Sequence, residues 1–218
     1  MTAMASCKRT TTAERPRDRE ATVRLLVEAV GRVLARQGFQ AVKVNVVARE
    51  AGVDKVLIYR YFDGLPGLVA AFANSGDFWP DARELAGGDM EAFRALPFTE
   101  RLVMGVRNYL RALRNRPMTQ EILAWRFMVH NELTDALDSV RESVGTRLLG
   151  LLQPDDSAPP DLDMSALFAI LGGIINHLGV RARSETHFAG LSLNDATTWE
   201  RLEAMLAHMI RSALSNQG

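Results

Sequence analysis

Side chains that can bind DNA gather in one short stretch of the sequence. They are Lys55, Val56, Tyr59 and Arg60. Lysine and arginine bind phosphate oxygens or the O6 and N7 acceptors of guanine, tyrosine binds phosphate, and valine contacts the methyl group of thymine. Residues at this spacing share one face of a helix, and the major groove of DNA admits one α-helix. The stretch therefore indicates binding to double-stranded DNA.

The elements that would position these side chains are two short helices joined by a glycine turn. Residues 38–62 read GFQAVKVNVVAREAGVDKVLIYRYF. Gly52 is a natural left-handed end for the first helix, and the Asp54 carboxylate can cap the second. VKVNVV at 42–47 alternates like a strand, but its valines also have helical spacing, and we favour a helix. A helix-turn-helix unit places its second helix in the major groove.

The candidate DNA-binding residues of this unit come from both helices. They are Lys43, Val44, Lys55, Val56, Leu57, Tyr59 and Arg60. We expect Ile58, Tyr61 and Phe62 to pack in the core instead. The N-terminal arginines Arg15, Arg17 and Arg19 are expected to add phosphate contacts, because residues 1–18 read as a flexible basic arm.

The segment resembles the tetracycline-repressor (TetR) family of bacterial transcription regulators. The matching residues are Gly38, Phe39, Val44, Val47, Ala48, Ala51, Gly52, Val53, Ile58, Tyr59, Tyr61, Phe62 and Leu68. The resemblance covers residues 19–75 and implies a three-helix DNA-binding domain there, followed by a helical ligand-binding and dimerisation domain over 76–218. It also implies a homodimer that represses transcription from operator DNA and is released by a small molecule, through a shift of the linking helix at 65–77.

Four positions depart from the family's pattern. Lys43 stands where threonine is usual, Asp54 where serine is usual and Leu65 where lysine is usual, and Val56–Leu57 replaces glycine–threonine. Lys43 can make a salt-dependent phosphate contact, whereas Leu65 cannot. These departures keep open an alternative function, a helical protein–protein interaction module that has lost DNA binding.

The charge distribution agrees with an anionic partner for the first third only. Residues 1–62 hold twelve Lys/Arg and six Asp/Glu, a net charge of +6. Residues 63–218 hold fourteen basic and twenty acidic residues, a net charge of −6. A basic segment on an acidic remainder is typical of a nucleic-acid-binding part joined to a part with another role.

Helical periodicity fills the three long stretches without proline, so we predict an all-α chain. Nine helices are expected, and 78–97 is left ambiguous because Gly87, Gly88 and Pro97 interrupt it. The helix expected at 163–182 is apolar around most of its circumference, which requires burial on more than one side.

That apolar helix predicts a homodimer, paired through 163–182 and 196–214 with Gly172 and Gly173 allowing close approach. The candidate interface residues are Phe168, Ile174, Ile175, Leu178, Leu202, Leu206, Met209 and Ile210. The alternative is that this helix is simply the centre of the monomer. The candidate residues of a small-molecule pocket are Met104, Trp125, Phe127, Met128, Phe168, Leu171 and His177, for which core packing is the alternative.

Other chemistries lack support in the sequence. The one cysteine, Cys7, excludes an internal disulfide and a cysteine-based zinc site. The four histidines lack metal-binding spacing, so we predict no metal and no cofactor. Nucleophile-elbow, P-loop and dinucleotide-binding motifs are missing. We therefore predict that the chain is not an enzyme; a helical enzyme with a pocket in 78–218 is the less favoured alternative.

The sequence also predicts a cytoplasmic protein without a membrane partner. The N-terminus lacks the apolar core of a signal peptide. Residues 164–180 form an uncharged run near the lower length limit for a membrane span, but glycine, asparagine and histidine interrupt it.

Overall fold

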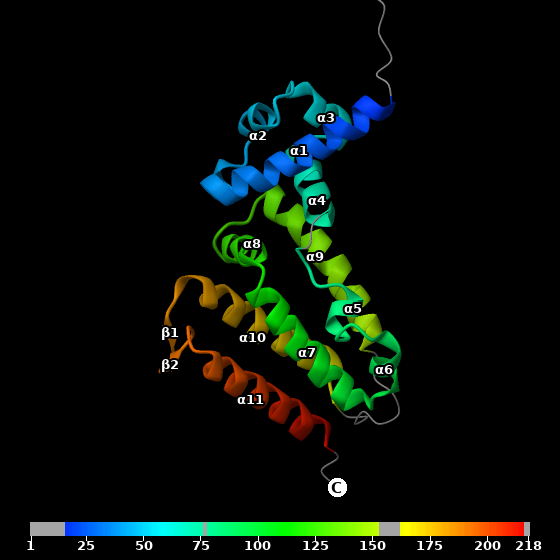
Figure 1. The fold of residues 1–218 in the computed structure, drawn as a ribbon, viewed down its shortest axis with the longest axis vertical. Coiled ribbons are helices and arrows are strands. Elements are labelled where there is room, and N and C mark those ends of the chain that lie inside the picture. The colour runs from blue at the N-terminus through cyan, green and yellow to red at the C-terminus, as the bar shows by residue number, and fades with distance from the viewer. Residues whose placement is uncertain (1–15, 76–77, 153–161, 216–218) are drawn as a thin grey trace, which may run out of the picture.

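The computed structural model describes residues 16–75, 78–152 and 162–215, and helices occupy most of them (Figure 1). The N-terminal part comprises α1 (Pro16–Gln37), the 3-10 helix η1 (Phe39–Ala41), α2 (Val44–Ala51), α3 (Val56–Phe62) and α4 (Leu65–Ser75). The remainder comprises α5 (Ala82–Leu85), α6 (Met90–Ala95), α7 (Phe98–Arg114), α8 (Pro117–Met128), α9 (Glu132–Leu151), α10 (Met164–Ser184) and α11 (Ala196–Leu214). The predicted all-α class is confirmed.

Three short helices and one hairpin were not expected. Within the described residues, η1, α5 and α6 raise the helix count above the nine predicted. Strands β1 (His187–Phe188) and β2 (Leu191–Ser192) form an antiparallel hairpin between α10 and α11. Its two turn residues, Ala189 and Gly190, both have positive φ, as this tight turn requires. Two-residue strands are too short to leave an alternating pattern in the sequence.

The ambiguous stretch at 42–47 is a helix from Val44 onward. Lys43 is extended, with φ −133° and ψ 148°, and forms the N-cap. Gly52 ends α2 in the left-handed conformation at φ 69°, as predicted. The favoured helix is therefore confirmed for Val44–Ala51, and Gly52 in the left-handed conformation closes it.

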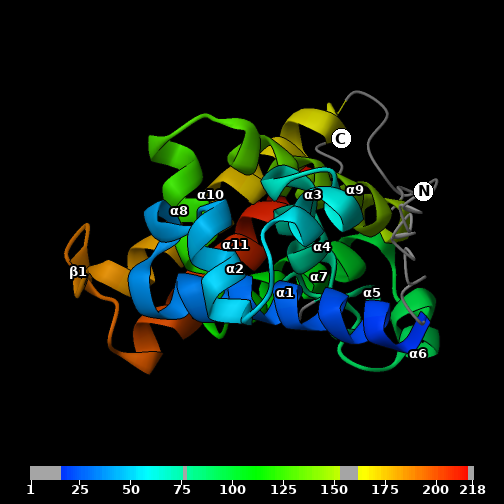
Figure 2. The ribbon, with the colours of Figure 1, turned by 90° about the horizontal axis from the view of Figure 1, so that it is seen from above.

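The N-terminal helices pack into a first hydrophobic core, which we call the N-terminal core. Its centre is formed by fully buried residues of α1, α3 and α4, among them Leu26, Ile58 and Leu68. The same core includes Ile122 of α8 and Leu137 of α9. Figure 2 shows α1, α2 and α3 lying over the remaining helices. Apolar packing thus continues across the domain boundary expected at residue 75.

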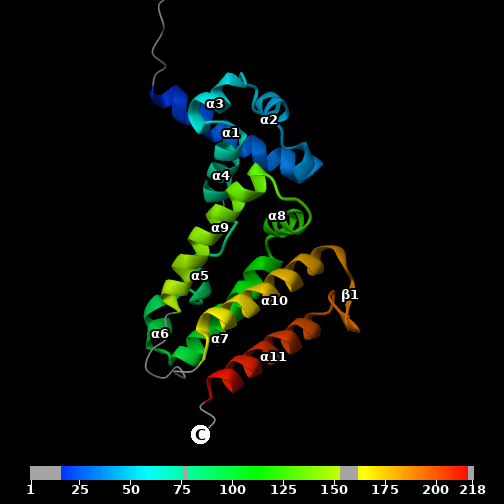
Figure 3. The ribbon, with the colours of Figure 1, turned by 180° about the vertical axis from the view of Figure 1, so that it is seen from behind.

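A second core, the C-terminal core, surrounds α7. Helices α10 and α11 both pack against α7 (Figure 3). Gly179 of α10 allows the closest approach, because a Cβ there would lie 2.4 Å from Cδ2 of Leu113. By length and composition α10 could cross a membrane. In this fold it is a bundle helix that buries Leu171, Ile175 and Leu178 inside the chain.

Candidate nucleic-acid interface and internal cavity

Helix α3 exposes the side chains expected to contact DNA. Val56 is 59% exposed and Tyr59 58%, and Lys55 and Arg60 are also exposed. Beneath them Ile58 is fully buried in the N-terminal core. The helix is therefore anchored on one face and presents basic, aromatic and aliphatic groups on the other. This arrangement suits a helix that enters the major groove.

The start of α3 is fixed by the predicted cap. The backbone N–H of Val56 donates to Oδ1 of Asp54 over 2.9 Å. Aspartate thus replaces the serine usual in the family without loss of the cap. Leu65, which stands in place of a lysine, is half-buried and packs against the N-terminal core.

Two candidate DNA contacts are partly turned inward. Val44 and Leu57 are half-buried and pack against the N-terminal core. Tyr61 and Phe62 pack against the same core, as predicted. The guanidinium carbon of Arg19 lies 5.5 Å from the centre of the Tyr61 ring. These side chains therefore hold α3 against the N-terminal core and contribute less to its exposed surface.

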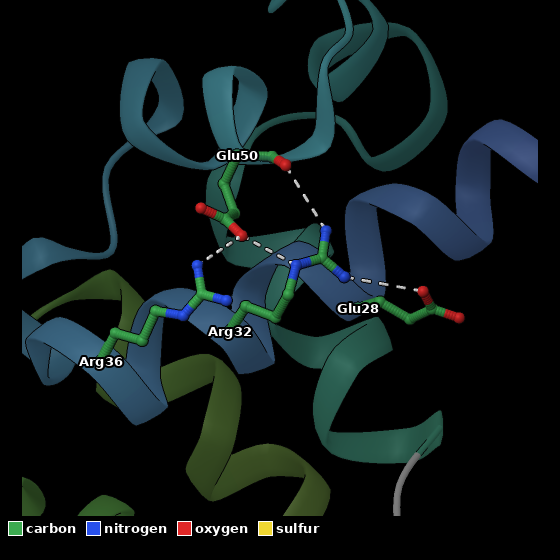
Figure 4. A network of polar contacts seen from close by, with 4 residues as sticks. All are labelled: Glu28, Arg32, Arg36 and Glu50. Carbon is green, nitrogen blue, oxygen red and sulfur yellow. Dashed lines mark hydrogen bonds and ion pairs between the residues drawn. The ribbon is translucent and has the colours of Figure 1, made fainter.

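A polar network ties α2 to α1, and it was missed by the sequence analysis (Figure 4). Nε of Arg32 donates to Oε1 of Glu50 over 2.8 Å, and Nη1 of Arg36 lies 3.4 Å from the same oxygen. Nη2 of Arg32 also reaches the backbone carbonyl of Glu50, and Glu28 pairs with Arg32 at 3.7 Å. Glu50 therefore holds the end of α2 on α1, just before the turn into α3.

Lys43 occupies the N-cap of α2 and is exposed. Its side chain makes no capping hydrogen bond there. The ammonium group is consequently available for a phosphate. Most of the expected basic arm, including Arg15, lies outside the described residues.

The C-terminal part contains a cavity of about 890 Å³ between α7, α9 and α10. Its deep walls are apolar: Leu102 and Val106 of α7 and Leu171 and Ile175 of α10 are buried. Its volume falls in the range of about 300–1,000 Å³ that is typical of small-molecule sites. The cavity separates α9, whose first half belongs to the N-terminal core, from the helices of the C-terminal core.

Four of the seven predicted pocket residues line this cavity, namely Phe127, Phe168, Leu171 and His177. The other three lie elsewhere. Met128 is 76% exposed, and Met104 packs beside Gly87. Trp125 stacks on Phe39 of η1, with the ring centres 5.8 Å apart. Neighbouring residues of a helix point in different directions, so the apolar cluster Trp125–Met128 does not share one surface.

Polar groups at one end of the cavity were not predicted. The hydroxyl of Tyr109 donates to Oδ1 of Asn176 over 3.0 Å. Burial raises the pKa of Tyr109, and the positive charge of Arg141 partly offsets this rise. Arg126 and Arg141 line the same end and both pair with Asp138. No local sequence pattern indicated this polar end, because its residues Tyr109, Arg126, Arg141 and Asn176 come from four different helices.

Helix α8 connects the two halves of the molecule. Besides stacking on η1, Trp125 donates through Nε1 to Glu121 over 2.7 Å. Glu121 also forms an ion pair with Arg183 of α10. Arg126, the residue that follows Trp125, lines the cavity. One helix therefore contacts the N-terminal domain, α10 and the cavity.

Half of the predicted dimer residues are turned into the chain's own core. Ile175, Leu178, Leu206 and Ile210 are between 0% and 6% exposed. They hold α10 and α11 against α7, so they are not available to a second chain. Phe168 lines the cavity instead. Burial depends on which side of α10 and α11 meets α7, and periodicity alone does not specify that side.

Apolar side chains nevertheless remain exposed on α10 and α11. Ile170 is 58% exposed, Met205 56% and Met209 44%. Ile174 and Leu202 are partly exposed. A Cβ at Gly172 or Gly173 would meet no atom within 4 Å, and both residues line the cavity. In the single chain, the close helix approach is therefore made by Gly179 and not by these two glycines.

Comparison with known proteins places the N-terminal domain in a family. Residues 20–72 match the family described as "Bacterial regulatory proteins, tetR family". No curated protein matches the chain. The resemblance inferred from the helix-turn-helix segment is thus confirmed.

Solved structures share the fold over most of the chain. A TetR family transcription regulator from Marinobacter aquaeolei VT8 has a TM-score of 0.55 and 18% identity, covering 92% of this chain and 98% of its own. The fatty acid degradation regulator FadR from Bacillus halodurans has a TM-score of 0.57 and 16% identity, covering 94% and 98%. A transcriptional regulator FadR from Bacillus subtilis, in complex with stearoyl-CoA, has a TM-score of 0.53 and 14% identity, covering 87% and 98%.

Proposed function

We infer that this chain, whose residues 20–72 belong to the tetR family of bacterial regulatory proteins, is a dimeric transcription regulator that releases its operator when a small molecule fills the cavity. The observation that carries the proposal is the family match over a domain whose α3 exposes Lys55, Val56, Tyr59 and Arg60. A cytoplasmic location follows from a role on bacterial DNA. The regulatory family and the absence of enzyme motifs in the sequence argue against catalysis.

In the proposed dimer, two copies of α3 bind the operator. A helix-turn-helix dimer contacts two major-groove faces about 34–36 Å apart, or a multiple of that distance. The exposed residues Ile170, Met205 and Met209 support pairing of α10 and α11 with a second copy. Soluble monomers rarely expose large continuous apolar surface. We therefore place the two-fold axis at this surface.

Release of DNA would follow from the position of the cavity between the two cores. A ligand that separates α7 and α10 from α9 also moves α4, which packs on α9. It further moves α8, whose Trp125 stacks on η1. The proposed route therefore includes α8 as well as the linking helix α4. A coupling of about 1–3 kcal/mol between the two sites would lower DNA affinity about 5- to 150-fold.

The ligand of one structural neighbour agrees with a cavity for an apolar body. One structural neighbour was solved with stearoyl-CoA, and another is described as a regulator of fatty acid degradation. We infer that the effector of this chain also has a substantial apolar part, because Leu102, Leu171 and Ile175 form the deep walls.

A gel-shift titration on the promoter region of the protein's own gene tests the proposal. Wild-type protein should bind a specific fragment, and Tyr59→Ala should bind it at least tenfold more weakly. Arg94→Ala, an exposed change on α6, is the matched control and should bind like wild type. Failure of wild type to bind any fragment of that region would contradict operator binding and favour an interaction module.

A further inference from the structure

One end of the cavity carries more positive charge than its protein partners neutralise. The guanidinium groups of Arg126 and Arg141 line it, and both pair with Asp138. Within the described residues, Asp138 supplies the only carboxylate in ion-pairing range of either arginine, and Nε of Arg141 is 3.6 Å from its Oδ1. The side chains of the two arginines are only 29% and 25% exposed. These two arginines and Asp138 together carry a net charge of +1, before the exposed carboxylate of Glu142, which also lines the cavity, is counted.

The same end also has an excess of hydrogen-bond donors. Nε1 of Trp79 is buried, and no acceptor for it is found among the described residues. Asn176 is 8% exposed, and its Oδ1 accepts a hydrogen bond from the hydroxyl of Tyr109. Both side chains line the cavity. A buried donor without an acceptor costs free energy, so a shift of the Trp79 ring that brings Nε1 to an acceptor on a ligand would be favourable.

The opposite end of the cavity is mainly apolar, with Ser165 of α10 as a polar lining residue. Tyr109 and Asn176 face each other at the polar end, whereas Leu102 lies two helical turns earlier on α7 and Phe168 two turns earlier on α10. Leu152, the residue after α9, packs against Gly105, which lies between Leu102 and Tyr109 on α7. The cavity thus changes along the helices from a cationic, donor-rich end to a hydrocarbon-lined end.

Resting on the proposed role of this cavity as the effector site, we propose that it binds an amphipathic monocarboxylate. The carboxylate lies between Arg141, Arg126 and the Trp79 indole N–H, and the hydrocarbon body extends along α7 and α10. Arginine binds carboxylates with two parallel charge-assisted hydrogen bonds. An amine would add positive charge beside two guanidinium groups. The remaining acid of the lining, Glu142, is exposed and therefore well solvated.

Isothermal titration calorimetry with three ten-carbon probes tests the head group. Decanoic acid, 1-decanol and decylamine have the same tail and differ in charge. We expect decanoate to bind at least tenfold more tightly than decanol and decylamine to bind more weakly than either. Equal affinity for decanoate and decanol, tightest binding of the amine, or no binding of any probe would each overturn the proposal.

A series of saturated acids tests the tail. Each methylene buried along the apolar walls is worth about 0.8 kcal/mol, so each added carbon from six to ten should tighten binding up to about fourfold. A flat series would contradict the proposed orientation, because the tail would then remain in water.

Substitution of Arg141 tests whether the carboxylate binds at the polar end of the cavity. Arg141→Met removes the charge at similar length and leaves Arg126 to pair with Asp138. We expect it to weaken decanoate binding at least tenfold while the affinity for decanol changes less than threefold. Arg94→Met is the matched control and should leave both affinities unchanged. Should Arg141→Met not fold, the head-group and tail series on the wild-type protein decide the question alone.

Parallel gel shifts separate this inference from the proposed function. Decanoate binding that leaves operator affinity unchanged would contradict ligand-induced release and leave the ligand class standing. Operator binding by a protein that takes up none of the probes would contradict the ligand class and leave the regulator standing.

Discussion

At the scale of single residues, Lys43 is the clearest example of a substitution that changes chemistry and not structure. It is an exposed N-cap that makes no capping bond, so its charge is free to act on DNA. Threonine at this position would offer a hydroxyl, which gives a contact with little salt dependence. We expect the lysine instead to make counterion release part of the DNA-binding free energy.

Lys43→Ala should therefore weaken operator binding and reduce the slope of log K against log salt by about 0.9. The measurement is fluorescence anisotropy of a labelled operator over a range of salt concentrations. Arg94→Ala serves as control for the loss of one positive charge at a distance from α2. An unchanged affinity and slope in Lys43→Ala would remove the phosphate contact assigned to it.

Two adjacent residues of α3, Ile58 and Tyr59, allow effects on DNA binding to be distinguished from effects on folding. Tyr59→Ala should change the free energy of unfolding by no more than about 0.5 kcal/mol, because its ring is 58% exposed. Ile58→Ala should cost about 2–5 kcal/mol, because Ile58 is fully buried. Urea unfolding beside a DNA-binding assay measures both effects. Strong destabilisation by Tyr59→Ala would place that ring in the core and withdraw it from the DNA contacts.

At the scale of elements, α10 shows how one helix can serve a core and a cavity. Its buried side packs on α7 through Gly179, and Gly173 faces open space. Gly179 must be a glycine because a larger residue would collide with Leu113. At Gly173 no neighbouring atom requires a glycine, so its main effect on stability there is a lower helix propensity.

The two glycines should respond in opposite ways to alanine. Gly179→Ala should destabilise the protein by about 1–3 kcal/mol, because the new Cβ would lie 2.4 Å from a fully buried Leu113 side chain. Gly173→Ala should stabilise it by up to about 1 kcal/mol through helix propensity. Thermal and urea unfolding of the two variants decide this. If Gly179→Ala were neutral, α7 and α10 would be less closely packed than described.

Ion pairs that join α7 and α11 differ in burial, and their contributions should differ accordingly. Arg111 binds Glu203 through two contacts of 2.8 and 2.6 Å, and the Glu203 side chain is only 4% exposed. Arg211 binds Glu100 through two 2.8 Å contacts, with both side chains at least 40% exposed.

Arg111→Ala should therefore destabilise the fold by about 2–3 kcal/mol, because among the described residues the longer 3.4 Å contact to Arg107 would then be the remaining ion pair of a buried carboxylate. Arg211→Ala should cost less than about 1 kcal/mol, as is usual for exposed pairs. Urea unfolding of both variants in the same buffer compares them. A larger loss for Arg211→Ala would mean that burial does not set the strength of these pairs.

At the scale of the whole molecule, the two hydrophobic cores and the cavity between them define how parts can move. The N-terminal core includes α4 and the first half of α9, whereas the C-terminal core holds α7, α10 and α11. Motion of one core relative to the other would carry α3 with it. Two copies joined through α10 and α11 would convert that motion into a change in the spacing of the two α3 helices.

Met205→Glu and Ile170→Glu should yield folded monomers with weak operator binding. Both side chains are more than half exposed, so a charge there should disturb a dimer surface and not the core. Sedimentation velocity measures the state, and circular dichroism checks the fold. Arg94→Glu is the control for an added negative charge and should remain dimeric. A dimeric, folded Met205→Glu protein would exclude α11 from the interface.

The sequence by itself determined the helical class, the helix-turn-helix and its family. Each depends on local signals: the left-handed Gly52, the Asp54 cap and the spacing of apolar residues in 38–62 all act within a few residues. The exposed side of α3 was predictable for the same reason, since Ile58 and Tyr59 point in different directions from a short amphipathic helix, one buried and one exposed.

Only the tertiary structure decided which residues share the cavity and which helix sides remain exposed. Tyr109 meets Asn176, and Arg126 and Arg141 meet Asp138, across helices that are far apart in the chain. Ile175 and Ile170 are equally apolar, yet one is buried and the other exposed, because α7 packs against one side of α10 only. Periodicity gives a helix its apolar sides, but the partner that covers each side is set by packing of the whole chain.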